Sequence, residues 1–335
     1  TGVQTCALPI SNTLAVTKGR LNTIGLGLIG AAVVISFLSY TYFGQDERQH
    51  LAWWLYLTSL GLLVAGTIWL TPALPFRPEL KRLFPNRQIV IGLVVVFGLA
   101  LFMRLFNFTQ QPFGIWFDEA EAGLAARHML TDPGYRPVFY QLINVTGHFL
   151  AVYAVALRWL GDSIYALRAV SVLFGLGGVL AAYLFGRELH GPRFGLALAF
   201  FVAVARWHVN FSRIAMTGID TPFFEFLTLF FLTRLLKRGY LRDALWAGLA
   251  LGFGLTFYTA FRLFILALAL FVGVMALRWT SPVLTAMRQG GWQRYLMAAA
   301  LLILTAWLVF MPVVQFALDN PDAFWYRTQQ ISILT

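Results

Sequence analysis

The stretch FYQLINVTGHFLAVYAVALRWLG, residues 139–161, decides the fold, because every later loop changes sides if this stretch crosses a membrane. It is long enough to cross, since about 20 apolar residues span about 30 Å of hydrocarbon. However, Gln141, Asn144 and His148 recur at i, i+3 and i+7 and would form a polar stripe on an otherwise apolar helix. Such a helix lies in the membrane interface. A transmembrane helix with a few buried polar groups is the alternative interpretation.

The composition indicates that the whole chain belongs in a membrane. Hydrophobic residues make up 59% of the 335 residues and charged residues only 12%, which excludes an ordinary soluble domain. We predict an all-α, polytopic membrane protein, because continuous apolar runs satisfy their own backbone hydrogen bonds in lipid only as helices. About nine runs are suited to spanning, namely 22–43, 51–71, 89–106, 164–186, 194–211, 219–236, 242–260, 262–279 and 296–316.

The distribution of basic residues favours a non-spanning stretch at 139–161. The net charge of +11 would suggest nucleic-acid binding in a soluble chain, but here the basic residues lie in short loops, where they set orientation. Without a span at 139–161, the cytoplasmic loops that follow it hold Arg187, Arg193, Arg234, Lys237, Arg238, Arg242, Arg278, Arg288 and Arg294, and the outer loops that follow it hold Arg206, Arg213, Arg262 and Arg327. We therefore expect 107–163 to be one long extracytoplasmic loop with one or two interfacial helices.

This loop contains an acidic cluster, Asp118, Glu119 and Glu121, within the segment WFDEAEAGLAARHML (116–130). Ionisable groups beside a bilayer are costly unless they face water or a partner, so the cluster is a candidate functional site. A structural interpretation stays open for Glu119 and Glu121, because carboxylates in the first turn of a helix are stabilised by the helix dipole.

Three parts of the chain carry a resemblance to a known family. They are the acidic segment 116–130, the aromatic P-x-F-Y segment (137–140) and GDSIYALRAVSVLFGLGGVLAAYLFGREL (161–189). Together they resemble the GT-C membrane glycosyltransferases, in the branch of the protein O-mannosyltransferases and aminoarabinose transferases, over roughly residues 88–330.

The resemblance also implies a division of the chain. Residues 13–87 would form two additional N-terminal spans, and 88–335 the catalytic module, which we expect to be truncated at its C-terminus. Residues 1–12 are expected to be a non-native leader, because TGVQTCALPI lacks an initiator Met and resembles translated cloning sequence more than a signal peptide with a charged start.

The resemblance implies a glycosyltransferase that moves a sugar from a polyprenyl-phosphate donor to an acceptor at the extracytoplasmic face, by a single inverting displacement. Asp118 matches the position of the catalytic base, and Glu119 would bind the acceptor or hold Asp118 in place. The leaving phosphate needs fixed cations, and arginine suits phosphate through its forked donors. The candidate substrate-binding residues are Arg213, Arg168, Asp220, Arg262, Arg127 and Tyr258.

Each of these candidates also has a structural interpretation. Arginine near the end of a span often extends its charge to the lipid headgroups, and the alternative place for Tyr258 is an aromatic belt at the membrane interface. Asp220 begins an apolar run and needs a partner there, for which Arg213 is available.

We predict no cofactor, because no recognisable ligand spacing joins His128, His148 and His208, and Cys6 is the only cysteine. A divalent cation is compatible with this chemistry but not required by it. The expected partners are the lipid-linked donor, a protein, lipid or glycan acceptor and membrane lipids, without nucleic acid. The expected location is the bacterial plasma membrane. A transporter or flippase for an amphiphilic or lipid-linked substrate is the alternative function, although such proteins usually carry their charges near mid-membrane.

Overall fold

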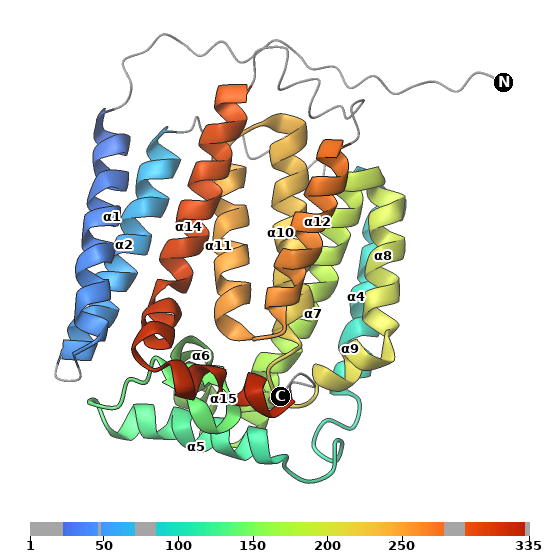
Figure 1. Ribbon diagram of the computed structural model, residues 1–335. Helices are drawn as coiled ribbons and strands as arrows, with labels where there is room; N and C mark the ends of the chain where they lie inside the picture. The colour runs from blue at the N-terminus through green and yellow to red at the C-terminus, as the bar shows by residue number, and fades with distance from the viewer. Residues whose placement is uncertain (1–22, 46–47, 71–84, 278–291, 332–335) are drawn as a thin grey trace.

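The computed structural model describes residues 23–45, 48–70, 85–277 and 292–331, which are mostly helical (Figure 1). The leader expected at 1–12 lies outside the described residues. The elements are α1 (Thr23–Phe43), α2 (Gln49–Leu70), α4 (Arg87–Leu105), α5 (Phe117–Thr131), β1 (Phe139–Tyr140), the 3-10 helix η2 (Gln141–Ile143), β2 (Val145–Thr146), α6 (Gly147–Leu160), α7 (Ile164–His190), α8 (Pro192–Val204), α9 (Arg206–Phe211), α10 (Asp220–Arg238), α11 (Leu241–Phe257), α12 (Phe261–Leu277), α14 (Trp292–Asp319) and α15 (Pro321–Ile331).

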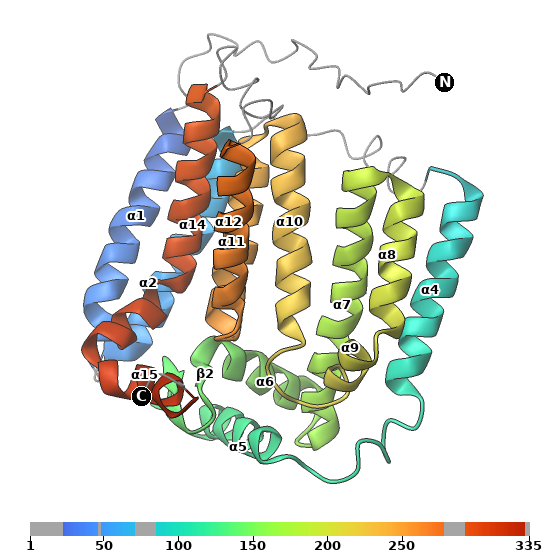
Figure 2. The same ribbon diagram turned by 45° about the vertical axis from the view of Figure 1, so that its right-hand side comes forward.

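The long helices run side by side, and α5, α6 and α15 lie across one end of them in both views (Figures 1 and 2). We call this end the α5 end. Helix α4 ends there and α7 begins there, so residues 106–163 do not pass through the bundle. The short antiparallel hairpin β1–β2, in which Phe139 is opposite Thr146, belongs to the same end.

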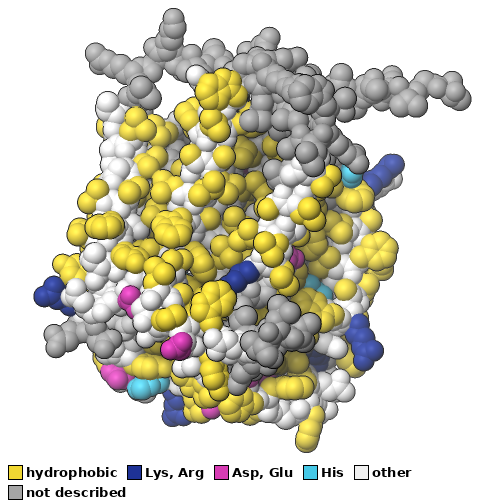
Figure 3. All heavy atoms as spheres, viewed as in Figure 1, with side chains coloured by type: hydrophobic (Ala, Val, Ile, Leu, Met, Phe, Trp, Pro, Cys, Tyr) yellow, Lys and Arg dark blue, Asp and Glu magenta, His cyan; other side chains and the backbone are white. Residues whose placement is uncertain are grey.

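Five of the described helices are long and apolar enough to cross a membrane, namely α1, α2, α4, α7 and α14. Hydrophobic side chains cover most of the helix surface seen in Figure 3, as a lipid-facing surface requires. Helices α8, α10, α11 and α12 run beside these five in Figures 1 and 2 but are shorter or less apolar. The count of nine spans therefore stays a prediction.

Two of the predicted helices are wrong in detail. The stretch 139–161 is not one helix, because Asn144 adopts a left-handed conformation (φ 55°, ψ 46°) that ends η2, and α6 begins only at Gly147. The polar stripe of Gln141, Asn144 and His148 consequently does not exist. The run 194–211 is broken at Ala205, where ψ is 119°, so it forms α8 and the short α9.

The N-terminal hairpin α1–α2 is packed tightly both internally and against the rest of the bundle. A Cβ atom built on Gly66 would lie 2.8 Å from the carbonyl oxygen of Gly25, so the two helices need glycine at this crossing.

The Tyr56 hydroxyl on α2 donates a 2.9 Å hydrogen bond to the Val309 carbonyl on α14 and lies 3.1 Å from His148 Nε2 on α6. Burial lowers the pKa of His148 to about 3, so this imidazole is neutral.

Candidate active site

Helix α5 begins at the acidic cluster because its first turn caps itself. The Glu119 carboxylate accepts a 3.1 Å hydrogen bond from the backbone N–H of Trp116, which satisfies a donor that the helix leaves open. Asp118 and Glu119 also place negative charge at the positive end of the helix dipole. Local sequence thus fixes where α5 starts and which residues lie in its first turn.

Glu119 is completely buried, and protein donors occupy both of its oxygens. Oε1 accepts from Arg168 Nε at 2.9 Å and from the Ala215 backbone N–H at 2.7 Å, and Oε2 accepts from Arg168 Nη2 at 2.9 Å. This carboxylate therefore joins α5, α7 and the segment before α10. Of the two roles predicted for Glu119, the geometry is compatible with holding Asp118 in place and not with direct contact to an acceptor.

Arg168 and Arg213 were both predicted to bind substrate, but in the structure they hold protein carbonyl groups. Arg168 donates to Pro112 O at 3.2 Å and to Gly114 O at 2.7 Å, in addition to Glu119. Arg213 donates to carbonyl oxygens of Met103, Phe106 and Gln111 at 2.7–2.9 Å. Burial, and then the nearby Arg168 charge, lower the pKa of Arg213. The two arginines thus fix the segment between α4 and α5.

Asp118 differs from its neighbour in being half-buried and unpaired. Its carboxylate makes no hydrogen bond or ion pair with the described part of the chain.

One turn further along α5, Glu121 Oε2 accepts a 2.9 Å hydrogen bond from the hydroxyl of Tyr140 in β1. Burial and the Glu121 carboxylate raise the pKa of Tyr140 to about 12, so its phenol stays protonated. Because Asp118 and Glu121 are three residues apart, they lie on the same side of α5.

Arg262, at the start of α12, differs from the other predicted arginines in that the guanidinium contacts that the structure describes are with aromatic rings and not with polar groups. Its guanidinium lies 4.6 Å from the ring centre of Phe324 and 5.8 Å from that of Trp325, both on α15. Among the described residues it has no hydrogen-bond acceptor or carboxylate partner. A half-buried arginine held only by aromatic rings retains its N–H groups for an anion.

The other predicted residues are distributed around the same end. Arg127 forms a 3.3 Å ion pair with Asp162, and both side chains are 61% exposed. Asp220 is buried, and its Oδ1 accepts from the Gly218 N–H at 2.7 Å. Arg213, which the sequence offers as a partner for Asp220, donates instead to the carbonyl groups named above. Tyr258 lies half-buried in the connection between α11 and α12.

The three outer histidines do not meet. His148 contacts Tyr56, and His208 Nδ1 lies 2.7 Å from Nη2 of the fully buried Arg104. His128 stacks on Tyr135 at the end of α5. Within the ranges that the structure describes, no three His, Cys, Asp or Glu side chains lie close enough together to hold a metal ion.

Sequence reasoning missed the Arg104–His208 pair and the Tyr140–Glu121 contact. The P-x-F-Y segment served only as a marker of the family resemblance. Its tyrosine, Tyr140, was a usable signal for a hydrogen bond to a nearby acid. The Arg104 contact depends on the break at Ala205, which turns α9 so that His208 points inward, and no local sequence signal indicates that break.

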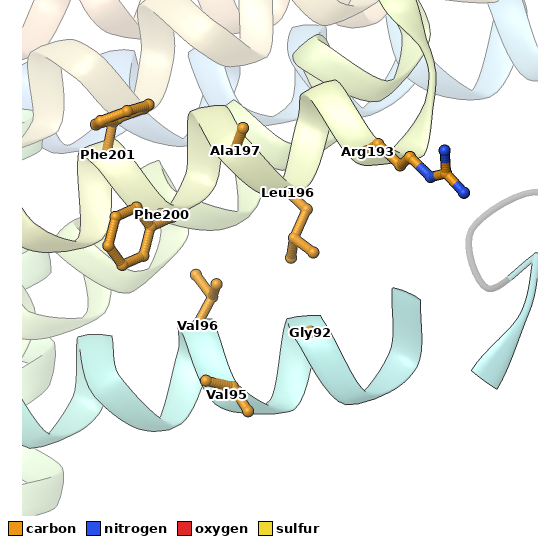
Figure 4. A pocket seen from close by; sticks show the side chains of 8 residues that line it. All are labelled: Gly92, Val95, Val96, Arg193, Leu196, Ala197, Phe200 and Phe201. Carbon is orange, nitrogen blue, oxygen red and sulfur yellow. The ribbon is translucent and has the colours of Figure 1, made fainter. Parts of the chain in front are cut away.

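Two apolar hollows on the described surface lie among the helices and not beside Asp118. The hollow in Figure 4, of about 530 Å³, lies between α4 and α8, with Val96, Leu196 and Phe200 in its wall and Arg193 extending away from it. A second one of about 320 Å³ lies between α1 and α14, beside Phe37 and Trp307. Both are lined almost entirely by apolar side chains, as expected of surface filled by lipid.

Comparison with known protein families places the second half of the site in a known family. The model of a family described as dolichyl-phosphate-mannose-protein mannosyltransferase matches residues 148–316, from the start of α6 into α14. No curated protein sequence gives a significant match. The matched region contains Arg168, Arg213 and Arg262, whereas α5 and its acids precede it.

Proposed function

The chain belongs to the dolichyl-phosphate-mannose-protein mannosyltransferase family, and from this premise we propose that it transfers a sugar from a polyprenyl-phosphate donor to an acceptor at the α5 end, with Asp118 as the catalytic base. The observation that carries the proposal is the contrast between two neighbouring acids. Asp118 makes no hydrogen bond or ion pair with the residues that the structure describes, whereas both oxygens of Glu119 accept from protein donors. The family favours this activity over the transporter that the sequence left open.

The proposed reaction needs one base and one anion-binding group. The acceptor oxygen attacks the anomeric carbon, its proton passes to the Asp118 carboxylate, and the bond from the anomeric carbon to the phosphate oxygen breaks. The phosphate leaves with the electron pair, and a single displacement inverts the anomeric centre. Asp118 suits the first task because it can reach a ligand without first losing a protein partner.

Arg262 suits the second task better than the other arginines. The donors of Arg168 and Arg213 already bind backbone carbonyls, and Arg127 is paired at the exposed surface. Arg262 keeps its N–H groups unbound among the described residues, and α15 shields it from water on one side. An arginine in such surroundings stabilises the charge that develops on a leaving phosphate.

Basic residues from the last turn of α7 onwards support an extracytoplasmic α5 end. Among the residues whose side chains the structure describes, those at the end opposite α5 are Arg187, Arg193, Arg234, Lys237, Arg238, Arg242 and Arg294, against Arg206, Arg213 and Arg262 at the α5 end. At the opposite end, Arg238 pairs with Glu188 at 2.8 Å, and Arg294 and Lys237 donate to nearby carbonyl groups. Basic loops remain in the cytoplasm during membrane insertion. The α5 end would then face the exported side, where a donor lipid presents its sugar.

The test uses the full chain in lipid nanodiscs with a radiolabelled polyprenyl-phosphate sugar. Asp118→Asn should lower transfer by about 10²- to 10⁴-fold, the usual contribution of a positioned general base. The matched control is Asp132→Asn, because Asp132 is exposed at the far end of α5 and asparagine keeps the oxygen that accepts from the Gly134 N–H. Unchanged transfer by Asp118→Asn would overturn the assignment of the base.

A second variant separates binding of the donor from proton transfer. Arg262→Gln should raise the KM for the donor by about tenfold or more, because a hydrogen bond to a charged group contributes about 1.5–3 kcal/mol. Donor kinetics equal to those of the unaltered chain would remove Arg262 from the phosphate site.

A further inference from the structure

The segment immediately before Asp118 exposes four large apolar side chains within five residues. Phe113 is 97% exposed, Ile115 60%, Trp116 57% and Phe117 60%. We call these four residues the apolar edge. Contiguous apolar surface of this kind usually marks a contact with another molecule or with a membrane. The proposed reaction chemistry uses none of these four side chains.

The backbone beneath the apolar edge is held firmly by buried polar groups. Arg168 binds the carbonyl oxygens of Pro112 and Gly114, and Glu119 accepts from the N–H of Trp116. Gly114 has a φ of +79°, a backbone conformation that favours glycine, and a Cβ atom built on it would have no neighbour within 4 Å. The polar groups thus turn inward while the side chains of the edge turn outward. Internal satisfaction of backbone groups is what contact with lipid demands.

The apolar edge continues a surface that already faces lipid. Helix α4 is one of the helices suited to crossing the membrane, and its last turns expose Phe102 (59%), Leu105 (45%) and Phe106 (62%). Figure 2 shows the chain leaving α4 at the α5 end and running past the ends of the long helices to α5. Continuity with the lipid-facing side of α4 indicates that the occupant of the edge is the bilayer. Aromatic residues, Trp in particular, are enriched at this depth.

We propose that the apolar edge inserts into the lipid leaflet at the α5 end and thereby holds the first turn of α5 at the membrane surface. The buried contacts of Arg168 and Glu119 give the edge a fixed shape before it meets lipid. Substrate carried by a membrane lipid would then meet Asp118 without leaving the bilayer surface. The contact with lipid itself does not depend on the proposed reaction, so either can fail alone.

The experiment measures membrane depth with nitroxide labels. In a Cys6→Ser background, Phe113→Cys and Phe117→Cys are labelled in nanodiscs of phosphatidylcholine and phosphatidylglycerol, and collision with oxygen is compared with collision with a water-soluble nickel chelate. Thr131→Cys, exposed at the other end of α5, is the matched control. The ratio of oxygen to nickel accessibility should be several-fold higher at 113 and 117 than at 131. Equal ratios at the three positions would overturn the proposal.

A second variant tests whether the edge positions α5. A label on Ala120→Cys, which is exposed in the first half of α5, reports the depth of the helix. Adding Phe113→Ser and Ile115→Ser should move this label towards water, with at least a twofold gain in nickel accessibility. Because both side chains are largely exposed, the substitutions remove little packing. A depth at Ala120 that does not change would mean that the edge does not hold α5 at the membrane.

Discussion

Breaking the buried pair between Glu119 and Arg168 should destabilise the α5 end strongly. Glu119→Leu leaves the Arg168 guanidinium, which is 3% exposed, without its carboxylate. It also removes the acceptor of the Ala215 and Trp116 N–H groups. Removing one partner of a buried ion pair costs about 3–5 kcal/mol, because the remaining charge stays desolvated and uncompensated. We expect a loss of that size in the free energy of unfolding.

The measurement is unfolding in mixed micelles titrated with sodium dodecyl sulfate, followed by tryptophan fluorescence. Arg168→Met should also destabilise the protein, but the double variant should cost less than the sum of the two single ones, by about 0.5–3 kcal/mol. The exposed pair supplies the control, since Arg127→Gln breaks a contact in which both side chains are 61% exposed and should cost about 0–1 kcal/mol. A cost below about 1 kcal/mol for Glu119→Leu, or additive effects of the two substitutions, would refute this view of the pair.

Three further outcomes are expected. Tyr140→Phe should lower the free energy of unfolding by about 0.5–1.5 kcal/mol, because the hydrogen bond to Glu121 is lost. The difference between the two proteins should be constant below pH 10 and should shrink as the pH rises towards 12, because the pKa of Tyr140 is raised in the folded state. A series of unfolding curves at different pH values measures it. The pKa of His148 is lowered to about 3 in the folded state, so below pH 6.5 the unfolded chain binds a proton that the folded chain does not. Acidification should therefore lower the free energy of unfolding by up to about 1.4 kcal/mol per pH unit below 6.5, and His148→Gln should not show this part of the pH dependence. Gly175→Ala should destabilise by about 1–3 kcal/mol in the sodium dodecyl sulfate titration, because the added Cβ would lie 2.6 Å from the Cβ of Ser212. Gly27→Ala is the control and should be neutral, because a Cβ there has no neighbour within 4 Å.

The sequence predicted the long helices because hydropathy is a local property. The runs 22–43 and 89–106 agree closely with α1 and α4. The break at Ala205 and the left-handed Asn144 were not predictable, since they depend on what packs around them. Hydrophobic runs therefore gave the position of helices but not the points at which tertiary contacts bend them.

Within the candidate site, residue type predicted the chemistry but not the partner. Arginine was expected to bind phosphate, and Arg168 and Arg213 instead bind carbonyl groups of a loop whose path no local pattern specifies. Asp118 and Glu119 were assigned to one site, yet successive residues of a helix point about 100° apart. The two side chains therefore point in different directions, and burial shows that Glu119 is the one that faces inward.

The hydroxyl of Tyr56 ties the first hairpin to the region shared with the family, through Val309 and His148. A shortened protein that started after α2 would lack the Tyr56 and Trp53 side chains that His148 contacts, and would uncover the part of α14 against which α1 and α2 pack. Expression trials should therefore keep α1 and α2, even though the family model begins only at residue 148.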